Sequence, residues 1–294
     1  MPCLPMKNIS AVLALGLTLA ACGPKPADDV QKSDQDYAAR MAQEHRNDVP
    51  TASPAASQKL GAPIKSQTVV YATIAGQDIN GYLAYPAQAE GGLPGVLVFH
   101  EWWGLNDNIK SMADQLAAQG YVALAADLYR GRVADKPDTA RAYMEAALKD
   151  SAALSQNLRQ AHAFLKDEIK ATRIGTIGWC FGGGVSLKAA LQLPDQLDAA
   201  VIYYGHVHAD PEQLKPLKTP ILGLFGGADQ GIPVEGVRQF EAALKSLGKS
   251  AEIHIYENAD HAFANPSGVN YKADAADDAW RRSLEFLNRH LKGG

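Results

Sequence analysis

The stretch that decides the fold is 173–184, which reads Arg-Ile-Gly-Thr-Ile-Gly-Trp-Cys-Phe-Gly-Gly-Gly. Its apolar first part, 173–177, predicts a buried strand, and the glycine-rich run after it predicts a tight turn. The residues from 185 to 193 predict a helix. Cys180 lies at the apex of the turn, in the spacing G-x-C-x-G of a nucleophile elbow with cysteine in place of serine. The glycines permit the strained turn that lifts the thiol clear of the sheet.

Cys180 is therefore a candidate nucleophile. At a helix N-terminus the unpaired N–H groups and the helix dipole favour a thiolate. The alternative is structural, because free cysteine is among the residue types most often buried. Glycine-rich turns between a strand and a helix also bind phosphate or serve only to reverse the chain.

The order of the remaining polar residues favours catalysis. Asp229 follows the apolar stretch 219–225 in a glycine-rich loop, and His261 follows the alternating stretch 251–256. In elbow-bearing hydrolases the nucleophile, the acid and the histidine occur in this order. An imidazole that accepts the thiol proton, with a carboxylate that fixes its tautomer, would make Cys180 a good nucleophile.

Four segments together resemble the dienelactone hydrolase family of α/β-hydrolases: the elbow, the loop G-G-A-D-Q-G-I-P at 226–233, D-H-A-F at 260–263 and H-E-W-W-G-L-N at 100–106. The resemblance covers most of 67–294. It implies an α/β-hydrolase fold, a mainly parallel sheet with helices on both faces. It also implies a catalytic set of Cys180 as nucleophile, His261 as base, Asp229 as the acid that orients it, Glu101 as a fourth participant near the resting thiol, and the backbone N–H groups of Trp102 and Phe181 as the oxyanion hole.

The histidine loop departs from the family pattern at one position. Members that hydrolyse dienelactone have an arginine there that binds the substrate carboxylate, whereas this chain has Asn265. A second family arginine lies in a D-L-Y-x-R segment, and either Arg130 or Arg132 matches it. We also expect three aromatic residues to line the substrate pocket: Tyr129, Trp103 and Tyr204. The substrate could be dienelactone, an uncharged ester or lactone, or an acid held by one arginine.

The first 66 residues differ in character from the rest. Residues 1–21 predict a secretion signal, because Lys7 precedes a short apolar run that ends in small residues. The run is too short to span a bilayer. Leu19-Ala20-Ala21-Cys22 resembles a bacterial lipobox, which predicts lipidation of Cys22 and an envelope lipoprotein; the alternative is a plain signal peptide and a secreted protein. Residues 22–66 are polar, and their composition favours a disordered spacer over a tether whose short helix, near 37–45, packs on the domain.

Strand and helix signals alternate from residue 67 onward, beginning with an antiparallel pair at 66–74 and 79–85 and including helical regions at 106–119 and 140–170. This alternation predicts a single α/β domain at 67–294. The net charge of −4 and scattered cations predict no nucleic-acid partner. We expect a monomer without cofactor. We also expect no metal, because His206 and His208 form an H-x-H pair with only one strong acid nearby.

The sequence thus predicts an ester or lactone hydrolase that works through a cysteine acyl-enzyme on a small-molecule substrate. Two alternatives remain open: a broader carboxylesterase acting on envelope esters, and an envelope binding protein that retains the fold without turnover. A redox role for Cys180 is disfavoured, because Cys3 and Cys22 would both be removed or modified and no resolving cysteine would remain.

Overall fold

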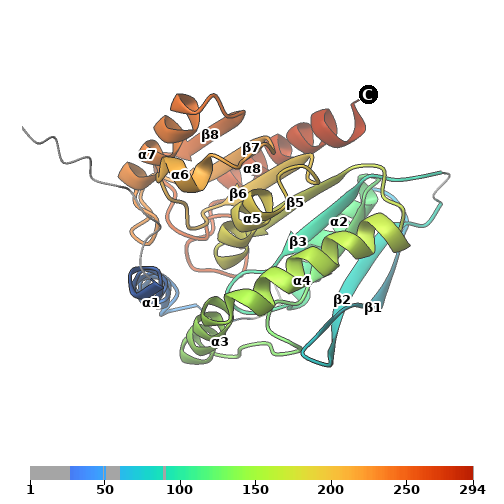
Figure 1. Ribbon diagram of the computed structural model, residues 1–294, viewed down its shortest axis with the longest axis horizontal. Helices are drawn as coiled ribbons and strands as arrows, with labels where there is room; N and C mark the ends of the chain where they lie inside the picture. Colours follow the sequence, from blue (N-terminus) through green and yellow to red (C-terminus); the bar gives the residue numbers. More distant parts are fainter. Residues whose placement is uncertain (1–26, 49, 51–59, 89–90, 294) are drawn as a thin grey trace, which may run out of the picture.

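The computed structural model describes residues 27–48, 50, 60–88 and 91–293 (Figure 1). Eight strands in this part of the chain form one sheet in the order β1-β2-β4-β3-β5-β6-β7-β8. The strands are β1 (Ile64–Ile74), β2 (Gln77–Pro86), β3 (Gly95–Phe99), β4 (Val122–Ala126), β5 (Ile174–Trp179), β6 (Ala199–Tyr203), β7 (Ile221–Gly226) and β8 (Ala251–Tyr256). Strand β2 pairs antiparallel with β1 and β4, and every other pair is parallel.

Helices cover the sheet on both faces. They are α1 (Ala27–Glu44), α2 (Asp107–Ala118), α3 (Pro137–Lys149), α4 (Ser151–Ala163), α5 (Phe181–Gln192), α6 (Pro211–Leu214), α7 (Val234–Ser246) and α8 (Ala273–Leu287). In Figure 1, α4 and α5 lie in front of the strands. Helix α2 packs on β2, β3 and β4, and α8 packs on β6 and β7. Strands β3 to β7 are buried along their whole length, as expected for a parallel sheet covered on both sides. The predicted fold class is confirmed.

Local chemistry explains where several helices begin and end. Asn106 caps α2, with its side chain accepting a hydrogen bond from the Ile109 N–H. The predicted helical region 140–170 is divided into α3, α4 and a π-helical turn, Phe164–Glu168. The division falls at Asp150, which ends α3 and caps α4 by accepting from the Ala153 N–H. A second π-helical turn, Asn288–Lys292, extends α8.

Helix α1 is the main difference from the sequence prediction. The polar composition of 22–66 favoured a disordered spacer, but the structure has an 18-residue helix at 27–44. Tyr37, Met41 and His45 follow one another at intervals of four residues and are almost fully buried. This spacing puts them on one helical face, so burial against the domain stabilises a helix of modest intrinsic propensity. The predicted signal at 1–21, Cys22 and the linker 51–57 lie outside the described residues.

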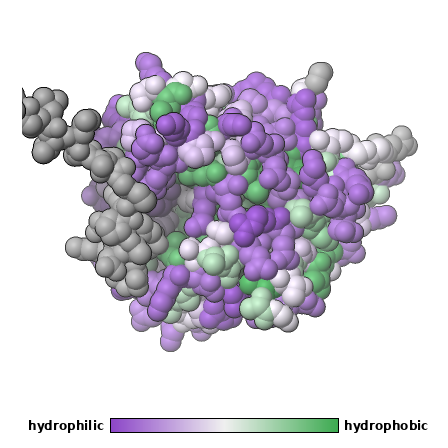
Figure 2. All heavy atoms as spheres, viewed as in Figure 1, coloured by the Kyte–Doolittle hydropathy of each residue, from purple (hydrophilic) through white to green (hydrophobic). Residues whose placement is uncertain are grey.

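The surface of the described chain carries few large apolar side chains. Val70, Val133, Val269 and Tyr271 are the exposed ones, and the face in Figure 2 is mostly hydrophilic with small separate hydrophobic areas. No described helix combines the length and the apolar character that crossing a membrane requires.

Candidate active site

The elbow at Cys180 has the expected geometry. Strand β5 ends at Trp179, α5 begins at Phe181, and Cys180 between them has φ +53° and ψ −118°, a conformation that costs a non-glycine residue energy. Glycines on both sides make the turn possible. A Cβ on Gly178 would collide with the Gly182 carbonyl, and a Cβ on Gly182 would collide with the Phe99 carbonyl. The thiol is therefore held at the end of β5 by close backbone packing.

The structure brings Asp229 and His261 together beside this thiol. Asp229 follows β7 and His261 follows β8, so both side chains come from the carboxyl edge of the sheet. His261 Nδ1 is 2.7 Å from Asp229 Oδ2, and Asp229 Oδ1 accepts a hydrogen bond from the Ile232 N–H. Both side chains are buried, and the carboxylate is oriented by the backbone. Since Nδ1 is occupied, His261 presents Nε2 toward the centre of the site.

Electrostatics favour a charged thiolate and imidazolium pair. Burial alone would raise the pKa of Cys180, but His261 and then His45 outweigh it and lower that pKa to about 6. Burial alone would lower the pKa of His261, but Asp229 and the Cys180 thiolate hold it well above its ordinary value. The lowered pKa of the thiol and the raised pKa of the imidazole both favour the thiolate, the form of cysteine that reacts as a nucleophile.

Glu101 is buried close to Cys180 but is hydrogen-bonded to other residues. Asn265 Nδ2 donates to Glu101 Oε2 at 2.7 Å, and the Tyr204 hydroxyl donates to Oε1 at 3.4 Å. Burial, and then the negative charge on Cys180, raise the pKa of Glu101 to about 7. Asn265, which the sequence placed in the substrate pocket, therefore holds Glu101.

The two predicted oxyanion donors lie on separate elements. Phe181 is the first residue of α5, so its N–H has no acceptor within the helix. Trp102 follows Glu101 in the loop after β3. His100 Nδ1 is 2.6 Å from the Glu101 carbonyl oxygen, and His100 Nε2 accepts a hydrogen bond from the Leu128 N–H at 3.1 Å. The carbonyl of Glu101 and the N–H of Trp102 belong to one planar peptide, so His100 fixes the direction of that N–H. Nothing in the sequence pattern around His100 indicated this role.

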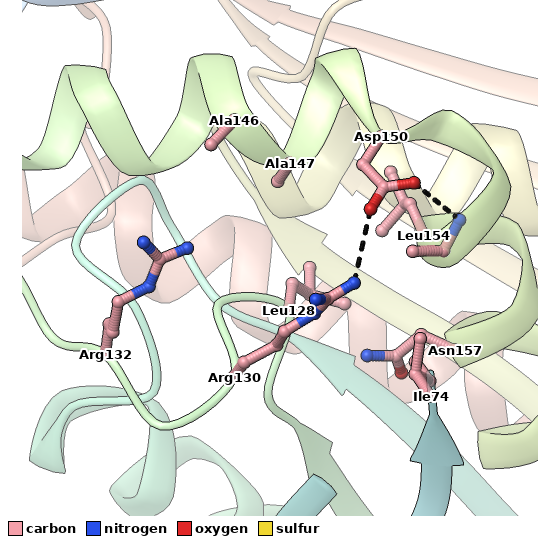
Figure 3. A pocket seen from close by; sticks show the side chains of 10 residues that line it. Ile74, Leu128, Arg130, Arg132, Ala146, Ala147, Asp150, Leu154 and Asn157 are labelled. Atoms are coloured by element: carbon pink, nitrogen blue, oxygen red, sulfur yellow. Dashed lines mark hydrogen bonds and ion pairs between the residues drawn. The ribbon is translucent and has the colours of Figure 1, made fainter. Parts of the chain in front are cut away.

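The two candidate arginines lie at a different place. Arg130 pairs with Asp150 at 3.2 Å, and Arg132 Nε donates to the Tyr129 carbonyl while its guanidinium stacks on Tyr143. Figure 3 shows Arg130 turned toward Asp150 at the junction of α3 and α4. Both arginines line a cavity of about 150 Å³ whose walls include none of the four catalytic candidates. The Tyr129 side chain is buried, and its ring stacks on Phe181, the residue next to Cys180. Burial, and then Cys180, raise the pKa of Tyr129 well above the ordinary value.

Helix α1 and the turn after it cover Cys180. The His45 ring stacks on Trp102, which in turn contacts Trp103 edge-on, and His45 Nε2 is 3.6 Å from Cys180 Sγ. Met41 Sδ is also 3.6 Å from that sulfur. Asp48 accepts from the Val269 N–H and so fastens the turn to the histidine loop. The helix itself packs against α3, beside which it is seen end-on in Figure 1.

Two more contacts hold α1 in place. Arg40 donates to the Gly231 carbonyl in the aspartate loop, and the Tyr37 ring packs at a tilt against His206 with ring centroids 4.8 Å apart. With α1 in this position Cys180 and His261 are fully buried. The cavity beside Glu101, Tyr204 and Asn265 is small, about 30 Å³.

Sequence reasoning missed His45, Met41 and Asp48. The available signal was the pattern H-x-x-D at 45–48, which lies within a segment whose composition indicated a spacer. No strand precedes it, so the rule that placed Asp229 and His261 at strand ends could not find it.

The sheet order, the elbow after β5 and the acid and histidine after β7 and β8 define an α/β-hydrolase. The model of the dienelactone hydrolase family matches residues 79–291. The chain therefore belongs to the dienelactone hydrolase family, and it is a hydrolase of carboxylic esters or lactones. The predicted family and enzyme class are confirmed.

Relatives and solved structures agree with this assignment. A protein of Escherichia coli K12 named "Putative carboxymethylenebutenolidase" is 34% identical over 256 residues, covering 82% of this chain and 94% of the relative. A protein of the same name from Methylorubrum extorquens is also 34% identical, over 78% of this chain and 87% of the relative. The crystal structure of a "Putative Dienelactone Hydrolase" from Klebsiella pneumoniae has a TM-score of 0.70 at 28% identity, and covers 77% of this chain and 99% of that one.

Proposed function

We propose that this protein cleaves a carboxylic ester or lactone through a thioester formed on Cys180. The observation that carries the proposal is the buried thiol at a strained elbow, next to a histidine whose far nitrogen is bonded to Asp229. A thiol, an imidazole and a carboxylate in this arrangement are the parts that nucleophilic acyl transfer requires.

The reaction follows from these positions. The Cys180 thiolate attacks the substrate carbonyl carbon, and the N–H groups of Trp102 and Phe181 stabilise the negative oxygen that forms. The carbon–oxygen bond to the leaving alcohol breaks as protonated His261 gives that alcohol a proton. His261 then takes a proton from water, the hydroxide attacks the thioester, and the carbon–sulfur bond breaks to restore the thiolate. Since a thiolate leaves more readily than an ordinary alkoxide, activated esters and enol lactones are the favoured substrates.

A specific observation favours uncharged substrates. Asn265 replaces a family arginine and is bonded to Glu101, while Arg130 is paired with Asp150. No free guanidinium lines the cavity beside Glu101 in the described structure, so a substrate carboxylate would lack a bidentate partner. A neutral ester or lactone is therefore proposed ahead of dienelactone itself.

The test is steady-state hydrolysis by the chain from Gly23 onward, compared with Cys180→Ala. The substrates are a small activated aryl ester and dienelactone. We expect the alanine variant to lose turnover of both, and the wild-type protein to prefer the neutral ester. Equal and negligible rates in the two folded proteins would instead favour a binding protein with the same fold.

Asp229→Asn tests the role of the acid separately. The amide would favour the wrong tautomer of His261, and we expect kcat/KM to fall by about 10⁴-fold, as in the serine triad. Asp195→Asn is the matched control, because Asp195 forms an exposed ion pair with Lys218. A loss of less than tenfold in Asp229→Asn would remove this carboxylate from the mechanism.

We also propose that Cys22 is acylated and holds the enzyme in the cell envelope. The proposal is supported by the apolar signal-like run and the small residues before Cys22. Metabolic labelling with a radioactive fatty acid tests it. Label in the wild-type protein and none in Cys22→Ser would support the anchor, whereas a soluble, unlabelled wild-type protein would support a plain signal peptide.

A further inference from the structure

Three metal-ligand atoms meet above the elbow. The ligand atoms of His45, Cys180 and His261 all lie within 4.8 Å of one another, and all three residues are buried. The family model matches residues 79–291, and His45 lies in the N-terminal segment before that match. The Nε2 atom of His261 is buried and has no hydrogen-bond partner in the described structure. A buried nitrogen that faces a thiol and a second imidazole nitrogen marks a position that a metal ion can fill.

Each histidine is backed by a carboxylate. His45 Nδ1 is 2.8 Å from Asp48 Oδ2, and His261 Nδ1 is 2.7 Å from Asp229 Oδ2. The other oxygen of each carboxylate accepts a backbone N–H, from Val269 and Ile232 respectively. Both rings are thus held in the orientation that directs Nε2 inward. The same arrangement of carboxylate, histidine and ion is the usual second shell of protein metal sites.

The spacing suits a tetrahedral ion. With metal–sulfur and metal–nitrogen bonds of about 2.3 and 2.0 Å, a tetrahedral angle separates sulfur from nitrogen by about 3.5 Å. The observed separation of Cys180 Sγ and His45 Nε2 is 3.6 Å. His261 is already within 4.8 Å of both, so a small ring movement would complete the third bond.

We propose that His45, Cys180 and His261 bind one thiophilic d¹⁰ ion, Zn²⁺ or Cu⁺, and that this ion holds α1 over the nucleophile. Thiolate and imidazole ligands select such ions over hard cations such as Mg²⁺ and Ca²⁺. The fourth position falls to water or to the thioether of Met41, whose sulfur is 3.6 Å from Cys180 Sγ. The inhibitory consequence rests on the proposed function, because it requires Cys180 to be the nucleophile: ion binding and acyl transfer then compete for the same sulfur.

The first experiment measures binding directly, with a tag-free chain from Gly23 onward. Zn²⁺ is added, excess is removed by dialysis, and bound metal is counted by elemental analysis. Co²⁺ serves as a spectroscopic probe, since a cobalt–thiolate bond absorbs in the near ultraviolet and a tetrahedral site absorbs strongly in the visible. We expect one ion per chain, both cobalt signatures in the wild-type protein, and loss of the thiolate band in Cys180→Ala.

His45→Gln and Asp48→Asn test whether α1 contributes. We expect His45→Gln to abolish stoichiometric Zn²⁺ binding after dialysis. Asp48→Asn keeps His45 and removes only the carboxylate that supports its ring, so we expect the affinity for Zn²⁺ to fall by about 10- to 100-fold. His206→Gln is the matched control, because His206 contacts α1 through Tyr37 and is not one of the three ligands. Its binding should equal that of the wild-type protein.

Cu⁺ is measured in parallel by anaerobic competition with a Cu⁺ chelator. If the Met41 thioether is the fourth ligand of Cu⁺, Met41→Leu should weaken Cu⁺ binding by at least tenfold. If water is the fourth ligand of Zn²⁺, the same variant should leave Zn²⁺ binding unchanged. Binding of either ion that depends on His45 supports the proposal. No stoichiometric binding of either ion, or equal binding by wild type and His45→Gln, would overturn it and leave His45 as a hydrogen-bond partner of the thiol.

Hydrolysis is measured separately, as the ratio of rates with a chelator and with Zn²⁺. We expect a large ratio in the wild-type protein and a ratio near one in His45→Gln, whatever the basal rate of each. A protein that binds Zn²⁺ but hydrolyses nothing would contradict the proposed function and leave the metal site standing. A protein that hydrolyses esters but does not bind Zn²⁺ would contradict the metal site and leave the proposed function standing.

Discussion

At the scale of single residues, strand ends explain why the catalytic candidates could be predicted. Cys180, Asp229 and His261 each follow an apolar strand, and parallel strands bring their carboxyl ends to one edge of the sheet. The pattern therefore located residues that are 81 positions apart from first to last, 180 to 261. The partner of Glu101 could not be predicted in this way, because a hydrogen bond between two loops depends on their packed conformation.

Asn265 gives a prediction at this scale. Replacing it with alanine leaves the buried Glu101 carboxylate without its 2.7 Å donor. We expect Asn265→Ala to lower the free energy of unfolding by about 1–3 kcal/mol, the cost of leaving a buried polar group unpaired. Urea unfolding at pH 8, where Glu101 is mostly ionised, measures this. Asn80→Ala, at an exposed position of β2, should change stability by less than about 0.5 kcal/mol. Equal effects in the two variants would contradict the prediction.

At the scale of elements, helices and strands with clear end signals were predicted to within a few residues, and α1 was not. The α2 region was expected at 106–119 and is found at 107–118, because Asn106 caps it. Helix α1 has no comparable local signal. Its burial depends on Tyr37, Met41 and His45 meeting residues more than 50 positions away, and composition alone does not report such packing.

Removing α1 should expose the active site. In metal-free protein we expect a chain that begins at residue 50 to hydrolyse a small activated ester with kcat/KM at least tenfold higher than the chain from Gly23. The reason is that Cys180 is fully buried beneath α1, so substrate binds only the fraction of molecules in which α1 is displaced. Arg40→Ala removes only the contact with Gly231 and should give a smaller increase in the same direction. Loss of hydrolysis in the shortened but folded chain would instead make α1 part of the catalytic site.

The packing of α1 on the domain should also weaken in acid. Burial, then Arg40 and His208, lower the pKa of His206 to about 4, while the unfolded value is about 6.5. A depressed histidine pKa stabilises the folded state above pH 6.5, and this contribution is lost as pH falls from 6.5 toward 4. His45 does not offset the loss: burial opposes its charge, but Asp48 and Cys180 raise its pKa to about 9, so its contribution is already complete below pH 6.5.

Hydrogen exchange of the α1 amides at pH 5 and pH 7 tests this prediction in metal-free protein. After correction for intrinsic exchange rates, α1 should be less protected at pH 5, whereas the strands β3 and β5 should be equally protected at both values. His206→Gln, which cannot be protonated, should abolish the difference. A difference that persists in this variant would assign the acid response to another group.

At the scale of the whole molecule, the edges of the sheet predict the state of association. Both edge strands could in principle pair with a second chain. Strand β1 is interrupted by a bulge between Val70 and Ala72, and its outer residues are mostly exposed and polar. Strand β8 carries Glu252, which pairs with Arg289. Charges and bulges of this kind disfavour pairing between edges.

We therefore expect the chain from Gly23 onward to be a monomer in solution. Light scattering after gel filtration, at concentrations from about 1 to 100 μM, should give the mass of one chain throughout, because the exposed apolar residues of the described surface are few. Val70, which is 51% exposed, is the apolar residue best placed to promote pairing along β1. If a dimer appears and Val70→Lys dissolves it, the β1 edge is an interface and the prediction fails. If Val70→Lys and wild type both have the mass of one chain, the bulge and the polar outer residues of β1 are sufficient to keep the edge unpaired.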